Sequence, residues 1–459
     1  MHSISNVVPS NKNKIIQAIR PYIMATMAKH PWIDAKSRFL FLPTLADEVK
    51  AYRSSIWRHA PLNLIVQAVT ELTKHTPTQS SITTHRVHEQ VELFGQYAIL
   101  SHRWGVEELS FDDVANLSDP RVRGKKGFKK LEGFSWAVKS LYGCRYLWMD
   151  TSCIDEADRN ASIPLMFNWY RHAYVCVIYL STGKEPSDPW GTRGWTLQEL
   201  LAASRIRYVA SDWWPVVNRG LKFDTWAWRA EGNLEPSTSF QDLVCVTGGF
   251  VWKTYEPGVH QAIPILEEMH TRQTSIPEDM VYSILSALDL NIPVKYGEGF
   301  DAAFHRLQLE ILAQTNVRRF LSWTESTPSR YNSMLPGGFP VWKPSGTWKD
   351  TYHEGPAFHP KFFFESSGVM RIMLSLYPPP STFPYDAQNV MFALMGEISE
   401  LTTKHHRGRV YYVGVLLRRV GLFHGEVYFP EGVYQRKRFK QYDKSQILAE
   451  VAPQWVYIV

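Results

Sequence analysis

Apolar and polar positions form alternating blocks along residues 95–215, and these blocks predict strands and helices in turn. Four short runs are almost continuously apolar, β-branched or aromatic, as in strands buried on both faces; they are Tyr97–Leu100, Arg145–Met149, Tyr174–Leu180 and Ile206–Val209. The stretches between them have the spacing of helices, at 127–142, 163–173 and 195–203. Strand–helix–strand alternation favours a parallel sheet with right-handed crossovers.

The segment before this block predicts helices. Isoleucines at 15, 16, 19 and 23 recur near a helical period, although Pro21 interrupts it, and a second helical pattern covers 64–72. A Ser/Thr/Pro-rich stretch at 76–84 marks the first boundary.

The segment after the block changes character twice. Residues 260–320 predict helices, with Ser275-Ile-Pro-Glu278 as a capping box and apolar faces at 280–288 and 300–312. From about 330 the chain has Gly, Pro and short β-prone runs, such as Lys361–Phe364, Val410–Leu417 and Gly425–Phe429. We therefore expect an α/β fold in four parts: a helical N-terminal region at 1–90, a parallel-sheet domain at 91–215, a helical extension at 216–325 and a β-rich domain at 326–459.

The composition, 44% apolar and 20% charged, is that of an ordinary globular protein. A net charge of +6 over 459 residues does not favour nucleic-acid binding. No apolar run approaches the roughly 18 residues of a membrane span, and the N-terminus has no signal-peptide pattern. The four cysteines have neither zinc-site nor disulfide-framework spacing. We expect a cytoplasmic protein with no membrane span, metal or resident cofactor.

Polar side chains follow the first two predicted strands directly. Because parallel strands end at one edge of a sheet, the two groups should meet there; they are Ser101, His102, Arg103 and Trp104, and Asp150, Ser152, Cys153 and Asp155. Arg103 could bind phosphate or carboxylate, and Trp104 could stack on a ring. The alternative is that Trp104 and Trp148 belong to the core and that the aspartates cap the next helix. Chemistry alone leaves both interpretations open.

Glu199 lies near the start of the last predicted helix, close to Arg193 and Trp195. A carboxylate in that setting could act on a cationic or glycosidic centre. The simpler interpretation, a first-turn glutamate favoured by the helix dipole, is preferred on these grounds alone. Other features have ordinary interpretations as well: the lysine-rich run 125–130 as a solvated helix start, Gly297-Glu-Gly299 as a turn, and Cys153 as a buried thiol.

Several blocks together resemble the fungal heterokaryon-incompatibility (HET) domain. The resemblance rests on Tyr97–Gly105, Lys125–Phe128, Trp148–Asp155 with Phe167–Tyr170, and Thr192–Leu201, and continues at Ile276–Ser283 and Tyr296–Gly299. The chain departs from the family pattern at Ser152, where a cysteine is usual, at Gly191, where a phenylalanine is usual, and in a shorter loop after Asp155.

HET domains are regarded as distant relatives of TIR domains, which have a flavodoxin-like parallel sheet. Leu100–Arg103 resembles the first TIR box, and Trp195–Leu200 resembles the block that carries the TIR catalytic glutamate. The resemblance implies that Glu199 cleaves NAD and that Ser101 and Arg103 line its pocket. The candidate substrate-binding residues are Ser101, His102, Arg103, Trp104, Asp150, Cys153, Asp155, Arg193 and Trp195.

The function implied by the resemblance is that of an effector of fungal non-self recognition that triggers programmed cell death. Two molecular activities remain open. One is an NAD glycohydrolase, with NAD as substrate and no cofactor. The other is a self-assembling interaction module, whose partner is a second copy or another incompatibility protein.

Overall fold

The computed structural model separates into two compact units, Met1–Tyr255 and Glu256–Val459, each considered by itself below. Its described residues are 39–41, 52–54, 96–142, 144, 146–182, 188–203, 205–214, 227–228, 256–314, 320–324, 326–341, 347–349, 362–364, 369–377, 390–399, 410–424, 427–443 and 454–459.

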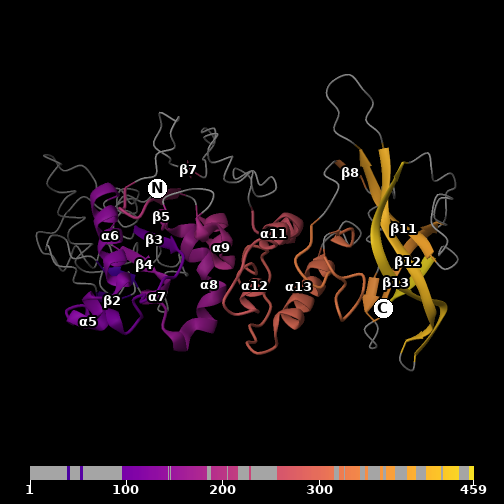
Figure 1. Cartoon of the computed structure of the whole chain (residues 1–459), viewed down its shortest axis with the longest axis horizontal. Coiled ribbons are helices and arrows are strands. Elements are labelled where there is room, and N and C mark those ends of the chain that lie inside the picture. The colour runs from indigo at the N-terminus through magenta and orange to yellow at the C-terminus, as the bar shows by residue number, and fades with distance from the viewer. Residues whose placement is uncertain are drawn as a thin grey trace, which may run out of the picture. The chain divides into compact units, whose positions relative to one another are not determined.

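The first unit is built on a sheet with four parallel strands at its centre (Figure 1). These are β3 (Tyr97–His102), β4 (Tyr146–Met149), β5 (Val175–Tyr179) and β6 (Arg205–Val209), in the spatial order β4-β3-β5-β6. With the strands numbered along the chain this order is 2-1-3-4, which is the flavodoxin-like arrangement. The α/β prediction and all four predicted strands are confirmed.

Three short strands extend this sheet at its edges. β1 (Phe39–Phe41) pairs antiparallel with β4 and with β2 (Tyr52–Ser54), and β7 (Ala227–Trp228) pairs antiparallel with β6. The helical patterns predicted from the isoleucines at 15, 16, 19 and 23 and from residues 64–72 lie outside the described residues. The described part of residues 1–90 consists of the strands β1 and β2.

Helices cover both faces of the parallel sheet. The crossover from β3 to β4 contains η2 (Asp113–Asn116), α5 (Pro120–Arg123) and α6 (Lys126–Leu141). The later crossovers contain α7 (Asp150–Cys153), η3 (Glu156–Asp158) and α8 (Arg159–His172), and then η4 (Pro189–Thr192) and α9 (Gly194–Ala202). Figure 1 shows α6 on one side of the strands and α8 and α9 on the other.

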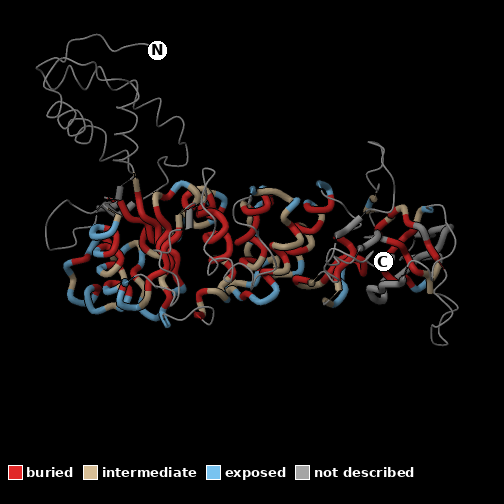
Figure 2. The backbone as a smooth tube through the Cα atoms, turned by 90° about the horizontal axis from the view of Figure 1, so that it is seen from above, coloured by how far each residue is buried: buried red, intermediate tan, exposed pale blue. Residues whose placement is uncertain are grey.

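The strands between these helices form the core of the unit, and they are almost entirely red in the burial colouring of Figure 2. Helix α8 begins earlier than predicted and includes Pro164, so it lacks the N–H that would bond to the carbonyl four residues back. Its buried face, which includes Phe167 and Trp169, holds it on the sheet in spite of this loss.

A close approach between α6 and the loop after β3 depends on Gly127. Its backbone N–H donates to the Glu107 carbonyl at 3.0 Å, and a Cβ at this position would lie 2.3 Å from the backbone nitrogen of Leu109. Glu107 itself has a φ of 62°, which is uncommon for a residue other than glycine. Gly127 therefore allows the loop that carries Glu108 to press against α6.

The second unit begins with helices η6 (Val259–Gln261), α11 (Ala262–Met269), α12 (Asp279–Tyr282) and α13 (Phe300–Gln314). The predicted capping box at Ser275–Glu278 is wrong, because Glu278 caps no helix with its side chain. Its carboxylate instead accepts from the backbone N–H groups of Gly297 (2.8 Å) and Gly299 (2.9 Å). Both glycines have positive φ, so the predicted turn is present and encloses a carboxylate of the same chain.

The rest of the second unit is β-rich, as predicted. Its strands are β8 (Thr347–Lys349), β9 (Phe362–Phe364), β10 (Met370–Tyr377), β11 (Val390–Ser399), β12 (Val410–His424), β13 (Val427–Asp443) and β14 (Gln454–Ile458). The order β8-β11-β12-β13-β14-β10-β9 has an additional β11–β10 pairing, which closes five of the strands into a ring. All pairings in it are antiparallel except β13–β14.

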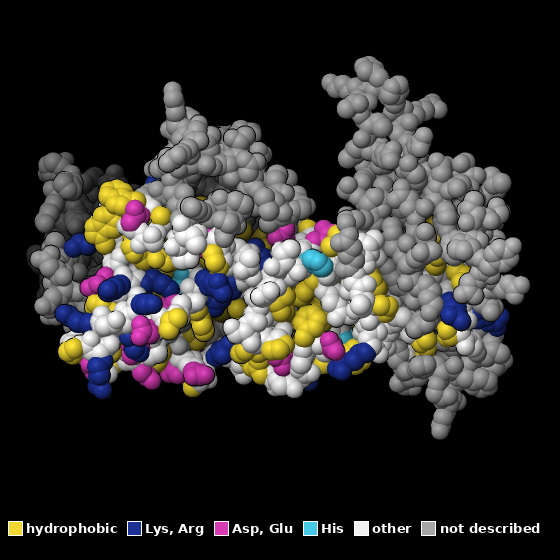
Figure 3. Space-filling model, in the orientation of Figure 1, with side chains coloured by type: hydrophobic (Ala, Val, Ile, Leu, Met, Phe, Trp, Pro, Cys, Tyr) yellow, Lys and Arg dark blue, Asp and Glu magenta, His cyan; other side chains and the backbone are white. Residues whose placement is uncertain are grey.

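The described surface gives two further observations. Among the described residues, no helix has the length and apolar character needed to cross a membrane. On the face drawn in Figure 3, Lys and Arg are interspersed with Asp and Glu over the described part of the first unit. Mixed charge of this kind produces no strong field of one sign on that face.

Candidate functional site

Polar residues follow β3, β4 and β5 at the carboxyl edge of the sheet, and the structure brings most of them together. Ser101 and His102 end β3, Asp150 follows β4, and the segment from Asp188 to Glu199 follows β5. In a 2-1-3-4 sheet the chain changes direction at the first and third strands, here β3 and β5, and ligands bind in the crevice beside that point. The predicted location of the site at this edge is therefore consistent with the topology.

Glu199 is at the centre of the group. It is the sixth residue of α9, so the first-turn interpretation is wrong; the helix begins at Gly194 and turns this side chain toward the sheet. Glu199 is 1% exposed, and its Oε2 accepts a hydrogen bond of 2.6 Å from Ser101 Oγ. The Ser101 oxygen in turn accepts from Trp190 Nε1 at 2.8 Å. Two consecutive hydrogen bonds thus link the side chains of Trp190, Ser101 and Glu199 at the carboxyl edge of the sheet.

The environment of Glu199 favours its neutral form. Burial and then the negative charge of Asp150 raise its pKa to about 7, against the opposing effects of Arg193 and the hydroxyls of Ser101 and Tyr170. The Tyr170 hydroxyl comes from α8 and donates to the Leu100 carbonyl at 3.0 Å. A carboxyl with a pKa near 7 exchanges its proton in the range where most enzymes work, and such groups are concentrated at functional sites.

Asp150 connects this buried group to the surface. Its Oδ2 accepts from Trp104 Nε1 at 2.7 Å, and its Oδ1 accepts from the Thr151 backbone N–H at 2.8 Å. Trp104 is 48% exposed, so it does not belong to the core. The Arg193 guanidinium lies 4.6 Å from the centre of the Trp104 ring and donates to the His102 carbonyl at 2.8 Å. Arg193 and Trp104 thus form the outer layer of the site.

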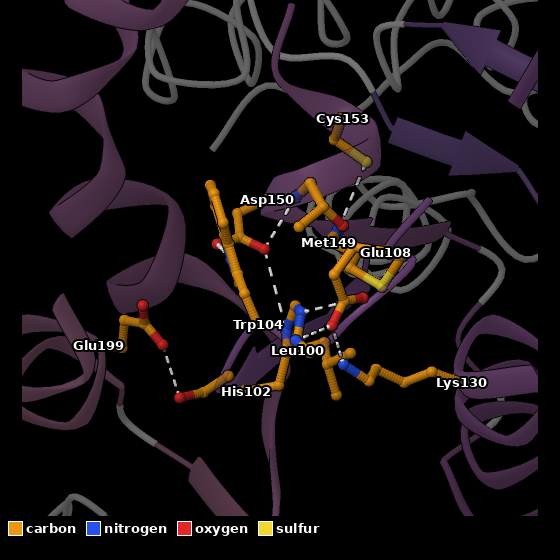
Figure 4. A network of polar contacts seen from close by, with 12 residues as sticks. Leu100, His102, Trp104, Glu108, Lys130, Met149, Asp150, Cys153 and Glu199 are labelled. Atoms are coloured by element: carbon orange, nitrogen blue, oxygen red, sulfur yellow. Dashed lines mark hydrogen bonds and ion pairs between the residues drawn. The ribbon is translucent and has the colours of Figure 1, made fainter. Parts of the chain in front are cut away.

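His102 lies behind this layer, between two carboxylates (Figure 4). Its Nδ1 is 3.8 Å from Asp150 Oδ1, and its Nε2 is 3.7 Å from Glu108 Oε2. Glu108 also accepts from the Gly105 N–H at 2.6 Å and forms an ion pair with Lys130 of α6. Burial by itself would raise the pKa of Glu108, but the contacts with His102 and Lys130 outweigh that effect and lower it to about 2.

The remaining predicted residues have other surroundings. Arg103 is exposed and takes no part in the contacts described above. The Asp155 side chain accepts from the Ala157 N–H and caps η3, as the alternative interpretation proposed. Cys153 is a buried thiol whose sulfur accepts from the Met149 N–H at 3.4 Å. Trp195 is half-buried in the first turn of α9.

Four residues of the site were not among the predicted ones: Trp190, Tyr170, Glu108 and Lys130. Tyr170 ends a block already similar to the HET pattern, and Trp190 lies two residues before the start of another, so both had a signal in the sequence. The interpretation of residues 125–130 as a solvated helix start is wrong for Lys130, whose side chain is 12% exposed because it faces Glu108.

No group of three His, Cys, Asp or Glu side chains among the described residues is arranged to hold an ion. Cys144, Cys153 and Cys176 are buried. Burial raises the pKa of Cys144 to about 12 and also raises that of Cys176.

We therefore expect these three thiols to resist alkylation in the folded protein, because burial keeps the reagent away from all of them. For Cys144 and Cys176 the raised pKa also makes the reactive thiolate scarce. Mass spectrometry after maleimide treatment should find them unmodified until the chain is unfolded. After unfolding without reductant, all four cysteines should react, including Cys245, which lies outside the described residues. A pair that reacts only after reduction would contradict this expectation.

Comparison with known proteins supports the resemblance of these blocks. Residues 97–188 match the family described as heterokaryon incompatibility protein (HET). The chain is 30% identical over 238 residues to the vegetative incompatibility protein HET-E-1 of Podospora anserina. That match covers 47% of this chain but only 16% of the relative. No solved structure matches the chain significantly. The strands, the polar edge and these matches agree, and residues 97–188 are similar to a HET domain.

Proposed function

We propose that this chain is an effector of heterokaryon incompatibility, which triggers programmed cell death after non-self recognition by hydrolysing NAD at Glu199. The observation that carries the proposal is the state of Glu199: a carboxyl with a pKa of about 7, hydrogen-bonded to Ser101 at the switch point of a flavodoxin-like sheet. The role in incompatibility is supported by the family match and by the named relative. Its site of action would be the cytoplasm, and its partner a second copy or another incompatibility protein.

The proposed reaction breaks the bond between the nicotinamide nitrogen and C1′ of the adjoining ribose. The bonding electrons leave with nicotinamide, which departs as a neutral ring, and positive charge develops on C1′ and the ribose oxygen. Water then adds to C1′ and releases a proton, which gives ADP-ribose. An ionised Glu199 would stabilise the positive charge as it develops. The exposed Trp104 would hold an aromatic ring, and the half-buried Arg193 beside it would hold a phosphate.

One observation favours a second candidate, the self-assembling module. Glu199 is 1% exposed and Ser101 is also fully buried, so a dinucleotide would reach the carboxylate only if neighbouring side chains moved. In this alternative the same hydrogen bonds stabilise the domain, and the death signal comes from association of several copies.

A time course with purified full-length protein and NAD separates the two candidates. The enzyme would convert NAD into equal amounts of nicotinamide and ADP-ribose, measured by chromatography, at a rate that saturates with NAD. The assay should cover protein concentrations at which light scattering detects self-association, because assembly could be required for activity. NAD that stays intact in assembled protein would exclude the enzymatic function and leave the assembly module.

A further inference from the structure

His102 has an unusual position for a histidine. Its side chain is 0% exposed, and neither ring nitrogen makes a hydrogen bond in the described structure. A neutral imidazole in such a place would leave a buried donor and a buried acceptor unsatisfied, which is unfavourable. The two groups that face its nitrogens are both carboxylates, Glu108 and Asp150, at 3.7 and 3.8 Å.

The charges around the ring indicate which form of the imidazole fits. Asp150 approaches from the start of α7 and Glu108 from the loop after β3, while Lys130 of α6 lies behind Glu108. Arg193 binds the carbonyl of His102, and Glu199 of α9 lies near enough to Asp150 to be affected by its charge. When Glu199 is ionised, it adds a third negative charge to those of Glu108 and Asp150. Lys130 and Arg193 supply two positive charges, so the charges are balanced only if the imidazole supplies the third. An unbalanced charge at this depth would be costly.

We propose that His102 is a positioning residue: its imidazolium lies between Glu108 and Asp150, holds Asp150 in place under Trp104, and weakens the repulsion that Asp150 exerts on an ionised Glu199. His102 was expected to bind substrate, and its enclosure gives it this different role. The inference deepens the function proposed for Glu199 and rests on it, but the measurements below do not use NAD, so either proposal can fail without the other.

The first measurement observes the ring directly in the full-length protein. Nitrogen chemical shifts of histidine-labelled protein distinguish imidazolium from neutral imidazole, and the His102 signal is the one absent from His102→Gln. We expect imidazolium shifts at pH 7. His305 of the second unit is the internal control, because burial alone lowers its pKa and its ring should be neutral. Neutral-ring shifts for His102 at pH 7 would overturn the proposal, whether or not the variant folds.

The second measurement determines the pH at which Glu199 ionises, with and without His102. The pH at which Glu199 ionises can be obtained from the stability difference between a protein and its Glu199→Gln variant over a range of pH. In the His102→Gln background this midpoint should rise by about one pH unit, a tenfold smaller ionised fraction at a given pH. Adding Asp150→Asn should reverse the rise, because the repelling charge is then gone. A midpoint that does not move in His102→Gln would mean that the histidine serves only packing.

Discussion

Glu199→Gln should reduce NAD hydrolysis by about 10³-fold, which corresponds to about 4 kcal/mol in the activation barrier. The amide keeps the size of the side chain and can still accept the hydrogen bond from Ser101, but it cannot carry the negative charge that stabilises the oxocarbenium-like centre. The measurement is the rate of nicotinamide release under saturating and limiting NAD. Cell killing by the same variant, expressed at the level of the parent, should be lost in parallel.

Glu278→Gln is the matched control for this experiment. Glu278 is also a buried glutamate with defined hydrogen bonds, but it belongs to the second unit and its partners are backbone N–H groups of a glycine turn. Its substitution should leave NAD turnover within the range of the parent. Normal turnover and killing by a folded Glu199→Gln protein would show that this carboxyl is structural.

Glu199→Gln, which should lower activity, should raise the free energy of unfolding of the first unit above pH 7. In the unfolded chain Glu199 ionises near its ordinary pKa of 4.5, and in the folded unit near 7. Between these values the folded state binds more protons, so its free energy of unfolding falls as the pH rises. The loss begins near pH 4.5 and is complete above pH 7, where it amounts to about 3 kcal/mol. The Glu199→Gln variant lacks this titration. Its free energy of unfolding, relative to that of the parent, should therefore increase by that amount between pH 4 and pH 8.

Because the chain has two units, a single unfolding transition cannot be assumed for the whole protein. Hydrogen exchange of the β5 amides, which lie in the core of the first unit, measures the relevant free energy at each pH. Asp150→Asn should reduce the effect, since that charge contributes to the shift. A difference between parent and Glu199→Gln that is the same at pH 4 and pH 8 would refute the assigned ionisation. Together, lower activity and higher stability are what a strained functional group is expected to produce.

The parallel sheet could be predicted because its strands are buried on both faces. Continuous apolar runs such as those at Tyr97–Leu100 and Tyr174–Leu180 are typical of such strands, and their alternation with helices favours a parallel sheet. The edge where Ser101 and Asp150 meet followed from the same rule. These are properties of local pattern and connection, which a sequence shows directly.

The electrostatic part of the site could not be predicted, because it depends on distances between segments far apart in the chain. The burial of Glu199 results from the exact start of α9 at Gly194 and from contacts with Ser101 and Tyr170, on other elements. Lys130 appears in a lysine-rich run that is typical of solvent exposure, and only the approach of Glu108 gives it a partner. Similarly, the Ser275–Glu278 pattern satisfied a capping rule, but the glycine turn at 297–299 provided better donors for the carboxylate.

The closed ring of strands in the second unit has a consequence for the order of folding during synthesis. β14 inserts between β13 and β10, and the backbone N–H of Ser333 also bonds to the carbonyl of Val459. The ring is therefore incomplete until the last of these residues has left the ribosome, whereas the parallel strands of the first unit are all available by Val209. Since domains tend to fold in the order of their synthesis, the first unit can form its site while the second sheet still lacks its closing strand.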